Sequence, residues 1–348
     1  MDSLTQLTLG AAVGEAALGD KVGKKAPLWG AFLGTLPDLD VLANPFLTEM
    51  EALAFHRSLT HSLLFMVVMA PLMGKLLDRL HTKDAVGVRP WGWMVLAVLA
   101  THVGLDCLTT YGTQIFYPFS RYPVILGTIF IIDPLYTVPL GGGLLVGLFY
   151  APTDRRRRLA NYVGLGLSSA YLMLTGINKI YMEHTFEQAL KAQNLPHEQV
   201  YTKPTALNNV LWSGIAEDSS AFWIGYYSLF DDDTQIRFER IPKNHDLLGA
   251  AQSSPAMERL RWFSRGYFTV SQRGDVLFVH DLRFGRNDLG MTDSGQYVFT
   301  FRLKQSASGR YTGFTQTNPQ LSVRGPLLRR FWARLLGHPL PEPRFGKS

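Results

Sequence analysis

The run from Trp91 to Tyr111, WGWMVLAVLATHVGLDCLTTY, decides the expected fold, because it is long and apolar except around His102 and Asp106. A helix of this length can cross roughly 30 Å of hydrocarbon. In such a helix the imidazole and the carboxylate, four residues apart, share one face. An ionisable pair at this depth is costly unless it is paired, hydrated or bound to a cation. We interpret His102 and Asp106 as two ligands of a metal ion.

The composition favours a membrane protein with a second, more polar region. The chain has 348 residues, enough for two domains, with 47% hydrophobic and 18% charged residues, and the apolar ones gather in the first half. The net charge of +6 does not indicate a nucleic-acid partner, because many Lys and Arg residues lie in short loops between apolar runs. The single cysteine, Cys107, excludes an intramolecular disulfide and a Cys-based zinc site. A metal must therefore be held by histidines and carboxylates.

The first half, residues 1–178, predicts a polytopic α-helical membrane domain with about six helices. Basic residues concentrate in alternate loops, which by the positive-inside rule places the region after residue 178 on the outer side of the membrane, the periplasmic side if the membrane is a bacterial inner membrane. Asp2 stands where a signal peptide would carry Lys or Arg, and Glu15 interrupts the apolar run, so no cleaved signal peptide is expected. The candidate spans are 4–19 and 27–43, both short and glycine-rich enough to be tilted or re-entrant, then 58–77, 91–111, about 134–150 and 159–177.

Residues 179–325 predict a soluble, β-rich α+β domain. A helix is expected at 183–195, and aromatic and β-branched runs such as 221–230 and 275–284 predict an antiparallel sheet of about five to seven strands. The acidic turn Asp231–Asp233 favours a solvated loop over a calcium site.

The last segment, residues 326–348, predicts an amphipathic basic tail. Leu328, Phe331, Trp332 and Leu335 fall on one helical face and arginines on the other. Such a helix could lie on a bilayer surface or cover the sheet, and the sequence favours neither.

Polar residues from four separate segments converge at one level of the predicted membrane domain. Histidines and carboxylates without a thiolate suit Zn²⁺, with Mn²⁺ or Fe²⁺ as alternatives. Taken singly, several of them have ordinary roles as turn or helix-cap residues, and Asp133, before Pro134, is one of these. The predicted metal ligands are Asp38, Asp40, His61, His102 and Asp106, and the predicted catalytic residues are Asp40, His56 and Arg57.

The spacing of these residues suggests their roles. In an Asp-x-Asp pair one carboxylate can bind or bridge metal while the other orients a histidine. In a continuous helix His56 and His61 would lie about 140° apart, so both can face one ion only if His56 sits in the lead-in loop. We expect His61 to be a ligand, His56 a ligand or proton donor, and Arg57 a clamp for an anion such as phosphate. Such a set supports hydrolysis by a metal-activated water.

Five motifs occur in order: MDSLTQLTLGAAVGEAALG (1–19), GTLPDLD (34–40), HRSLTHS (56–62), THVGLDCLTTYGTQIFYPFS (101–120) and DPLYT (133–137). Over about residues 1–180 the chain resembles the bacterial membrane-bound metal-dependent hydrolase family of the YdjM type. The resemblance implies an inner-membrane protein with a metal site, in a family whose hydrolase activity is itself inferred. Many members have a histidine where this chain has Gln6, although Asp2 remains as an N-terminal candidate ligand.

A more distant pattern, an Asp followed by a His and then His-x-x-x-Asp, is similar to the zinc ligands of zinc-dependent phospholipase C and P1-type nucleases. That similarity implies zinc binding only for His102 and Asp106. The resulting hypothesis is an inner-membrane metal-dependent hydrolase that acts on a phosphoester or lipid-linked substrate at the outer face, in contact with membrane lipids. The alternatives are a transporter or non-catalytic metal-binding membrane protein, and a regulatory membrane protein whose outer domain binds a partner. The sequence does not indicate an oligomeric state.

Overall fold

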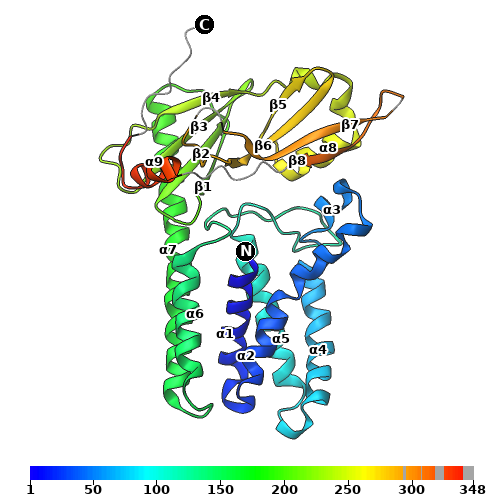
Figure 1. Cartoon of the computed structure of the whole chain (residues 1–348), viewed down its shortest axis with the longest axis vertical. Helices are drawn as coiled ribbons and strands as arrows, with labels where there is room; N and C mark the ends of the chain where they lie inside the picture. The colour runs from blue at the N-terminus through cyan, green and yellow to red at the C-terminus, as the bar shows by residue number, and fades with distance from the viewer. Residues whose placement is uncertain (293–294, 307, 318–324, 340–348) are drawn as a thin grey trace. The chain divides into compact units, whose positions relative to one another are not determined.

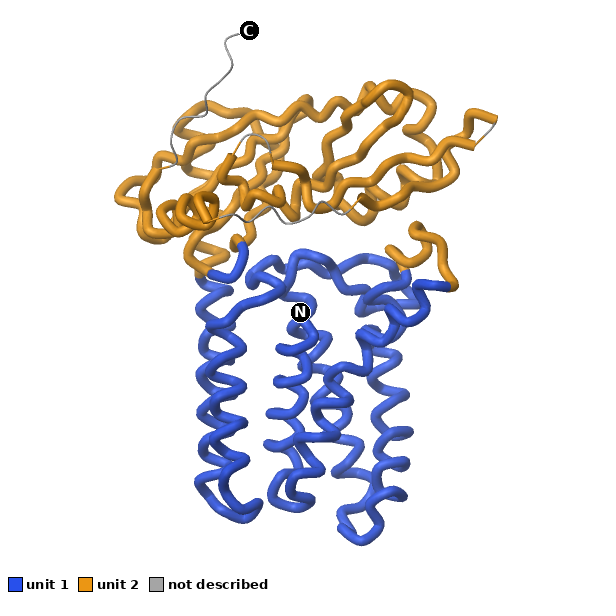
Figure 2. Tube along the Cα trace, viewed as in Figure 1, with its two compact units in different colours: residues 1–45, 55–177, 206–208 blue, residues 46–54, 178–205, 209–348 orange. Residues whose placement is uncertain are grey.

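The computed structural model describes residues 1–292, 295–306, 308–317 and 325–339. The chain divides into two compact units, shown in different colours in Figure 2. The first contains residues 1–45, 55–177 and 206–208, and the second contains 46–54, 178–205 and 209–348. The domain limits predicted at 178 and 325 stay a prediction.

The first unit is helical (Figure 1). Helix α5 lies at its centre, because Trp91, Val95 and Leu99 are fully buried in a core that α1, α2 and α4 also line. Its helices are α1 (Ser3–Val22), α2 (Lys25–Thr35), α4 (Leu63–Leu80), α5 (Val88–Cys107), α6 (Pro134–Leu148) and the first part of α7 (Arg155–Ala192), with 3₁₀ segments at Pro37–Phe46, Leu59–His61 and Thr82–Asp84. The short helix α3 (Glu49–Phe55) belongs to the second unit except for its last residue.

Helices α1 and α2 pack backbone against backbone through glycines. A Cβ atom added to Gly10 would lie 2.2 Å from the carbonyl oxygen of Gly30, and one added to Gly34 would lie 2.6 Å from that of Gln6. Only glycine permits so close an approach. The contact fixes the C-terminal end of α2, and the segment that follows it, beside the first turns of α1.

The predicted membrane spans are wrong. None of the helices in the described part of the chain is both long enough and apolar enough to cross a bilayer. At about 1.5 Å per residue, α2 with 11 residues and α6 with 15 fall short of a crossing of roughly 30 Å. Longer helices carry polar residues among the apolar ones, such as Asp78 and Arg79 in α4 and His102 in α5. The periplasmic placement of the region after residue 178 was inferred from loop charges between those spans, so it is no longer supported.

The second unit is built on two antiparallel four-stranded sheets rather than the single sheet of five to seven strands that the sequence predicts. The helix α8 (Pro255–Ser264) and a 3₁₀ segment (His245–Ser253) follow β4 and end the first sheet before β5 begins the second. The helix expected at 183–195 is the end of α7, which runs without a break from Arg155 to Ala192. The strands are β1 (Gln199–Pro204), β2 (Leu211–Glu217), β3 (Ala221–Ser228) and β4 (Phe238–Pro242) in one sheet, and β5 (Phe268–Arg273), β6 (Val276–Arg286), β7 (Tyr297–Gln305) and β8 (Tyr311–Thr317) in the other.

Helix α9 (Gly325–Leu335) forms part of the predicted tail and packs on the first sheet. Phe331 and Leu335 are buried in a cluster with Leu211 of β2. Arg334 makes two hydrogen bonds of 2.6 Å to Asp231, so this member of the acidic turn is an ion-pair partner. Residues 340–348 of the tail lie outside the described residues.

Candidate metal centre

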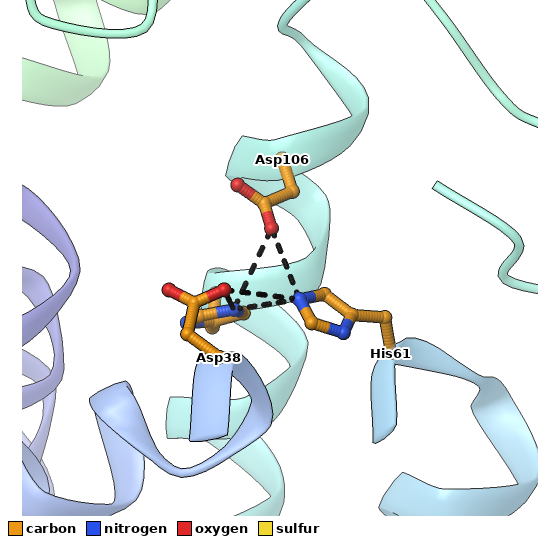
Figure 3. A group of neighbouring side chains, drawn as sticks. Asp38, His61 and Asp106 are labelled. Atoms are coloured by element: carbon orange, nitrogen blue, oxygen red, sulfur yellow. Dashed lines mark hydrogen bonds and ion pairs between the residues drawn. The ribbon is translucent and has the colours of Figure 1, made fainter. Parts of the chain in front are cut away.

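Four of the predicted ligands come together in the first unit. Asp38 lies in the 3₁₀ segment after α2, His61 in the 3₁₀ turn before α4, and His102 and Asp106 in the last turns of α5. One ligand atom from each lies within 4.8 Å of the other three. Figure 3 shows Asp38, His61 and Asp106 pointing toward one another. These four residues could hold a metal ion.

The distances between these ligand atoms fit a small divalent metal. Nε2 of His61 lies 3.4 Å from Oδ1 of Asp38, 3.2 Å from Oδ2 of Asp106 and 3.2 Å from Nε2 of His102. Nε2 of His102 lies 3.7 Å from the same Asp38 oxygen and 3.5 Å from the same Asp106 oxygen. A tetrahedron with metal–ligand distances of about 2.0–2.2 Å has edges of about 3.3–3.6 Å. These five separations are therefore close to the edges of a tetrahedral zinc site, and the sixth, between Asp38 and Asp106, is within 4.8 Å.

The two histidines are held so that Nε2 faces the centre of this group. Nδ1 of His102 donates a hydrogen bond of 2.6 Å to the carbonyl oxygen of Gly34, which fixes the neutral tautomer with a free Nε2. Burial lowers the pKa of His102 to about 4. Burial also acts to lower the pKa of His61, but hydrogen bonds to Asp106 and Asp38 outweigh it and raise that pKa. A bound cation takes the place of the proton that these hydrogen bonds favour on His61.

Asp106 has several polar and charged partners. Its Oδ1 accepts a hydrogen bond of 3.1 Å from Nε2 of Gln6, lies 3.2 Å from Nη2 of Arg57 and contacts the α-amino group of Met1. Although burial opposes ionisation, the positive charge of Arg57 holds the pKa of Asp106 well below its usual value. Its Oδ2 is buried and lies 3.2 Å from Nε2 of His61 and 3.5 Å from Nε2 of His102. A buried anionic oxygen that faces two imidazole nitrogens suits a cation site.

Asp40 lies outside the group of four, although the sequence placed it among both the ligands and the catalytic residues. Its Oδ1 lies 2.9 Å from Nδ1 of His56, and its Oδ2 accepts a hydrogen bond of 2.9 Å from the backbone N–H of Arg57. The side chain of His56 is 24% exposed, whereas that of Asp40 is 1% exposed. Asp40 therefore orients His56 at the rim of the site.

Arg57 is buried beside the ligands, in a backbone conformation that is unusual for its type. Its φ angle is +58°, in the left-handed region. The conformation is held by the N–H bond to Asp40 and by a hydrogen bond of 2.9 Å from Gln114 N–H to the Arg57 carbonyl. Its Nη1 donates to Thr109 at 3.0 Å, while its Nε is buried without a partner. Strained backbone of this kind clusters at functional sites.

Other candidates have different roles. Asp133 is buried outside the group, where it caps α6 by accepting a hydrogen bond from Leu135 N–H and receives another from the Tyr171 hydroxyl. Asp2 caps α1 by accepting from Thr5 N–H. The contacts of the Gly34 carbonyl and the Met1 amine were not predictable from residue types, because both are backbone groups. Only the spacing of glycines in α1 and α2 could have suggested that Gly34 lies close to another helix.

A family model described as YdjM inner membrane protein matches residues 1–181. The chain belongs to this family. A protein from Bacillus subtilis (strain 168), described as "Uncharacterized protein YfhP", is 26% identical over 306 residues, which cover 82% of this chain and 87% of that protein. No solved structure matches.

Membership of the YdjM inner membrane protein family confirms the resemblance drawn from the five motifs. All four residues that could hold a metal lie within the matched residues 1–181. The similarity to phospholipase C and P1-type nucleases gains no support from the comparisons. The protein is therefore a member of an inner membrane protein family, and it contains a group of Asp and His residues that could hold a metal ion.

Proposed function

We propose that this protein is a metal-dependent hydrolase that cleaves a phosphoester or lipid-linked substrate at a membrane surface. The observation that carries the proposal is the convergence of Asp38, His61, His102 and Asp106, whose ligand atoms lie within 4.8 Å of one another. The buried Oδ2 of Asp106 faces Nε2 of both histidines, which supports a cation shared by these groups. A mixed nitrogen and oxygen set of this kind suits Zn²⁺, with Mn²⁺ or Fe²⁺ as alternatives.

When bound, such an ion supplies Lewis acidity toward water and toward a phosphoryl oxygen. The protein's own residues supply the remaining functions. Asp40 accepts from Nδ1 of His56, which leaves Nε2 of this partly exposed imidazole available to give or take a proton. His56 is therefore the proposed general acid or base, and Asp40 its positioning residue.

Arg57 supplies positive charge beside the ligand group. Its guanidinium lies 3.2 Å from Asp106, and its buried Nε keeps a free donor. A planar guanidinium favours phosphate over uncharged substrates. The family's place in the inner membrane favours a substrate with a lipid component, such as a phospholipid or a polyprenyl phosphate.

A non-catalytic metal-binding protein is the second candidate, and one observation favours it. Four protein ligands close a tetrahedral zinc site, as in structural centres, whereas catalytic sites keep a position open for water. The side chain of Asp38 is 20% exposed, while those of His61 and Asp106 are fully buried. Asp38 is therefore the ligand whose displacement would open the site.

The test combines metal analysis with a generic phosphodiester assay on purified full-length protein. We expect about one metal ion per chain and metal-dependent hydrolysis of bis(p-nitrophenyl) phosphate. Asp106→Asn should lose both. His56→Gln should keep the metal and lose about 100-fold in turnover, because it removes only proton transfer.

His81→Gln is the matched control, since His81 is a histidine of the same unit that bonds to Trp29 at 2.8 Å, away from the site. Bound metal without hydrolysis of any ester would favour the non-catalytic candidate. If the purified protein binds no metal and Asp106→Asn behaves as wild type, both candidate functions are wrong.

A further inference from the structure

Helix α9 has two apolar stripes, and the sheet covers only one of them. Phe331 and Leu335 are 4% and 6% exposed and pack in the cluster with Leu211. Leu328, Trp332 and Leu336 recur at intervals of four residues and are 43%, 54% and 56% exposed. At about 100° per residue these three lie within about 80° of one another, adjacent to the buried pair. The helix thus keeps an apolar outer stripe after it has docked on its own domain.

Arg329 borders this outer stripe, because it is exposed about 20° round the helix from Leu336. Arg330 is also exposed, about 120° from Leu336, and α9 contains no acidic residue. Asp231 is paired with Arg334 on the inner side of the helix. The outer side therefore combines a tryptophan and two leucines with two exposed arginines.

We propose that the outer face of α9, made by Leu328, Arg329, Arg330, Trp332 and Leu336, docks on an anionic phospholipid surface. A row of Trp and Leu beside arginines is the pattern of helices that lie in the bilayer interface. Three apolar side chains are far fewer than the roughly 20–30 residues a side of a standard protein interface. They suffice for a shallow contact with lipid that basic residues strengthen. This contact is independent of the metal centre and of the proposed hydrolysis.

Spin labels on the full-length protein test the contact. Leu328→Cys and Leu336→Cys place labels on the outer stripe, and Asp275→Cys, in the exposed turn between β5 and β6, provides an aqueous control. The native Cys107 is buried, and wild type carried through the same labelling measures its background. The protein is mixed with vesicles of phosphatidylcholine alone, or with phosphatidylcholine and phosphatidylglycerol at about 7:3. Relaxation by oxygen then reports lipid exposure, and relaxation by a water-soluble nickel complex reports water exposure.

We expect the two α9 labels to become accessible to oxygen and shielded from nickel in the anionic vesicles, while the Asp275 label stays in water. Exchanging both arginines for glutamine should lower the lipid-to-water ratio of the α9 labels about 25-fold, since each contributes about fivefold. Circular dichroism confirms that the exchanged protein is folded. Labels that remain in water with both lipids would overturn the proposal. Labels shielded from both reagents, whatever the lipid, would overturn it in favour of a protein partner.

Discussion

Asp38 and Asp40 allow the metal assignment to be tested with two nearly identical changes. Both are carboxylates of the same 3₁₀ segment, but only Asp38 belongs to the group of four, while Asp40 bonds to His56 and to the backbone of Arg57. Asp38→Asn should abolish tight metal binding. Asp40→Asn should largely keep the metal and lose turnover.

The magnitudes follow from binding linkage. A metal at 100 times its dissociation constant stabilises the folded state by about 2.7 kcal/mol. Loss of a direct ligand, taken as about 100-fold in affinity, leaves about 0.4 kcal/mol at the same metal concentration. Asp40 lies 3.8 Å from Nδ1 of His61 and acts on that ligand only indirectly. A tenfold loss in Asp40→Asn would leave about 1.4 kcal/mol.

The assay is the shift in melting temperature on adding Zn²⁺, with metal content measured on the same samples. Wild type should show the largest shift, Asp40→Asn about half of it, and Asp38→Asn almost none. The reasoning fails if Asp38→Asn keeps the wild-type shift. It fails equally if the two variants lose the shift to the same extent, because the structure gives them different partners.

Three further predictions concern packing and charge. Gly30→Ala would place a Cβ atom 2.2 Å from the backbone oxygen of Gly10 and should lower the free energy of unfolding by about 1–3 kcal/mol. Gly166 has open space around it, so Gly166→Ala should raise the free energy of unfolding by about 0.5–1 kcal/mol. Melting temperatures of the two variants that shift in the same direction would contradict this. Glu15→Ala leaves the buried Arg157 without its two hydrogen bonds of 2.6 Å and should lower the free energy of unfolding, measured with denaturant, by about 3–5 kcal/mol. The double variant with Glu15→Met and Arg157→Met should recover most of that loss. Burial lowers the pKa of His280 to about 4. Between about pH 6.5 and pH 4 this histidine is therefore protonated in the unfolded chain but neutral in the folded protein. The free energy of unfolding should fall by up to about 3 kcal/mol as the pH drops through that range. His280→Gln should flatten the pH dependence of the melting temperature in that window, and an unchanged slope would exclude His280 as its source.

The sequence named all four residues that could hold a metal, but only the His102–Asp106 pair follows from short-range geometry. His102 and Asp106 are four apart in a helix and must share a face. Asp40 shows the limit of such reasoning. In a 3₁₀ helix with about three residues per turn, residues two apart point about 120° away from each other, so Asp38 points toward the group of four while Asp40 points toward His56. The sequence alone did not identify this segment as 3₁₀.

The prediction of membrane-spanning helices was wrong for a different reason. An apolar run such as 91–111 indicates a buried helix as well as a spanning one, and periodicity does not separate the two. The structure shows α5 surrounded by α1, α2 and α4, with Trp91 and Leu99 fully buried. Core packing within the first unit accounts for buried residues of this run such as Trp91 and Leu99, whereas Trp93 is 70% exposed.

The glycine contact between α1 and α2 has a direct consequence for the metal centre. The end of α2 carries the Gly34 carbonyl that orients His102, and the segment after it carries Asp38. Two of the four candidate ligands are thus positioned by the same end of one helix. An overpacked α1–α2 contact would move Asp38 and release the ring of His102 together, while His61 and Asp106 stayed in place. Since a displacement of about 1 Å is large against metal–ligand distances of about 2 Å, we expect overpacking at Gly10 or Gly30 to lower metal affinity although neither residue is a candidate ligand.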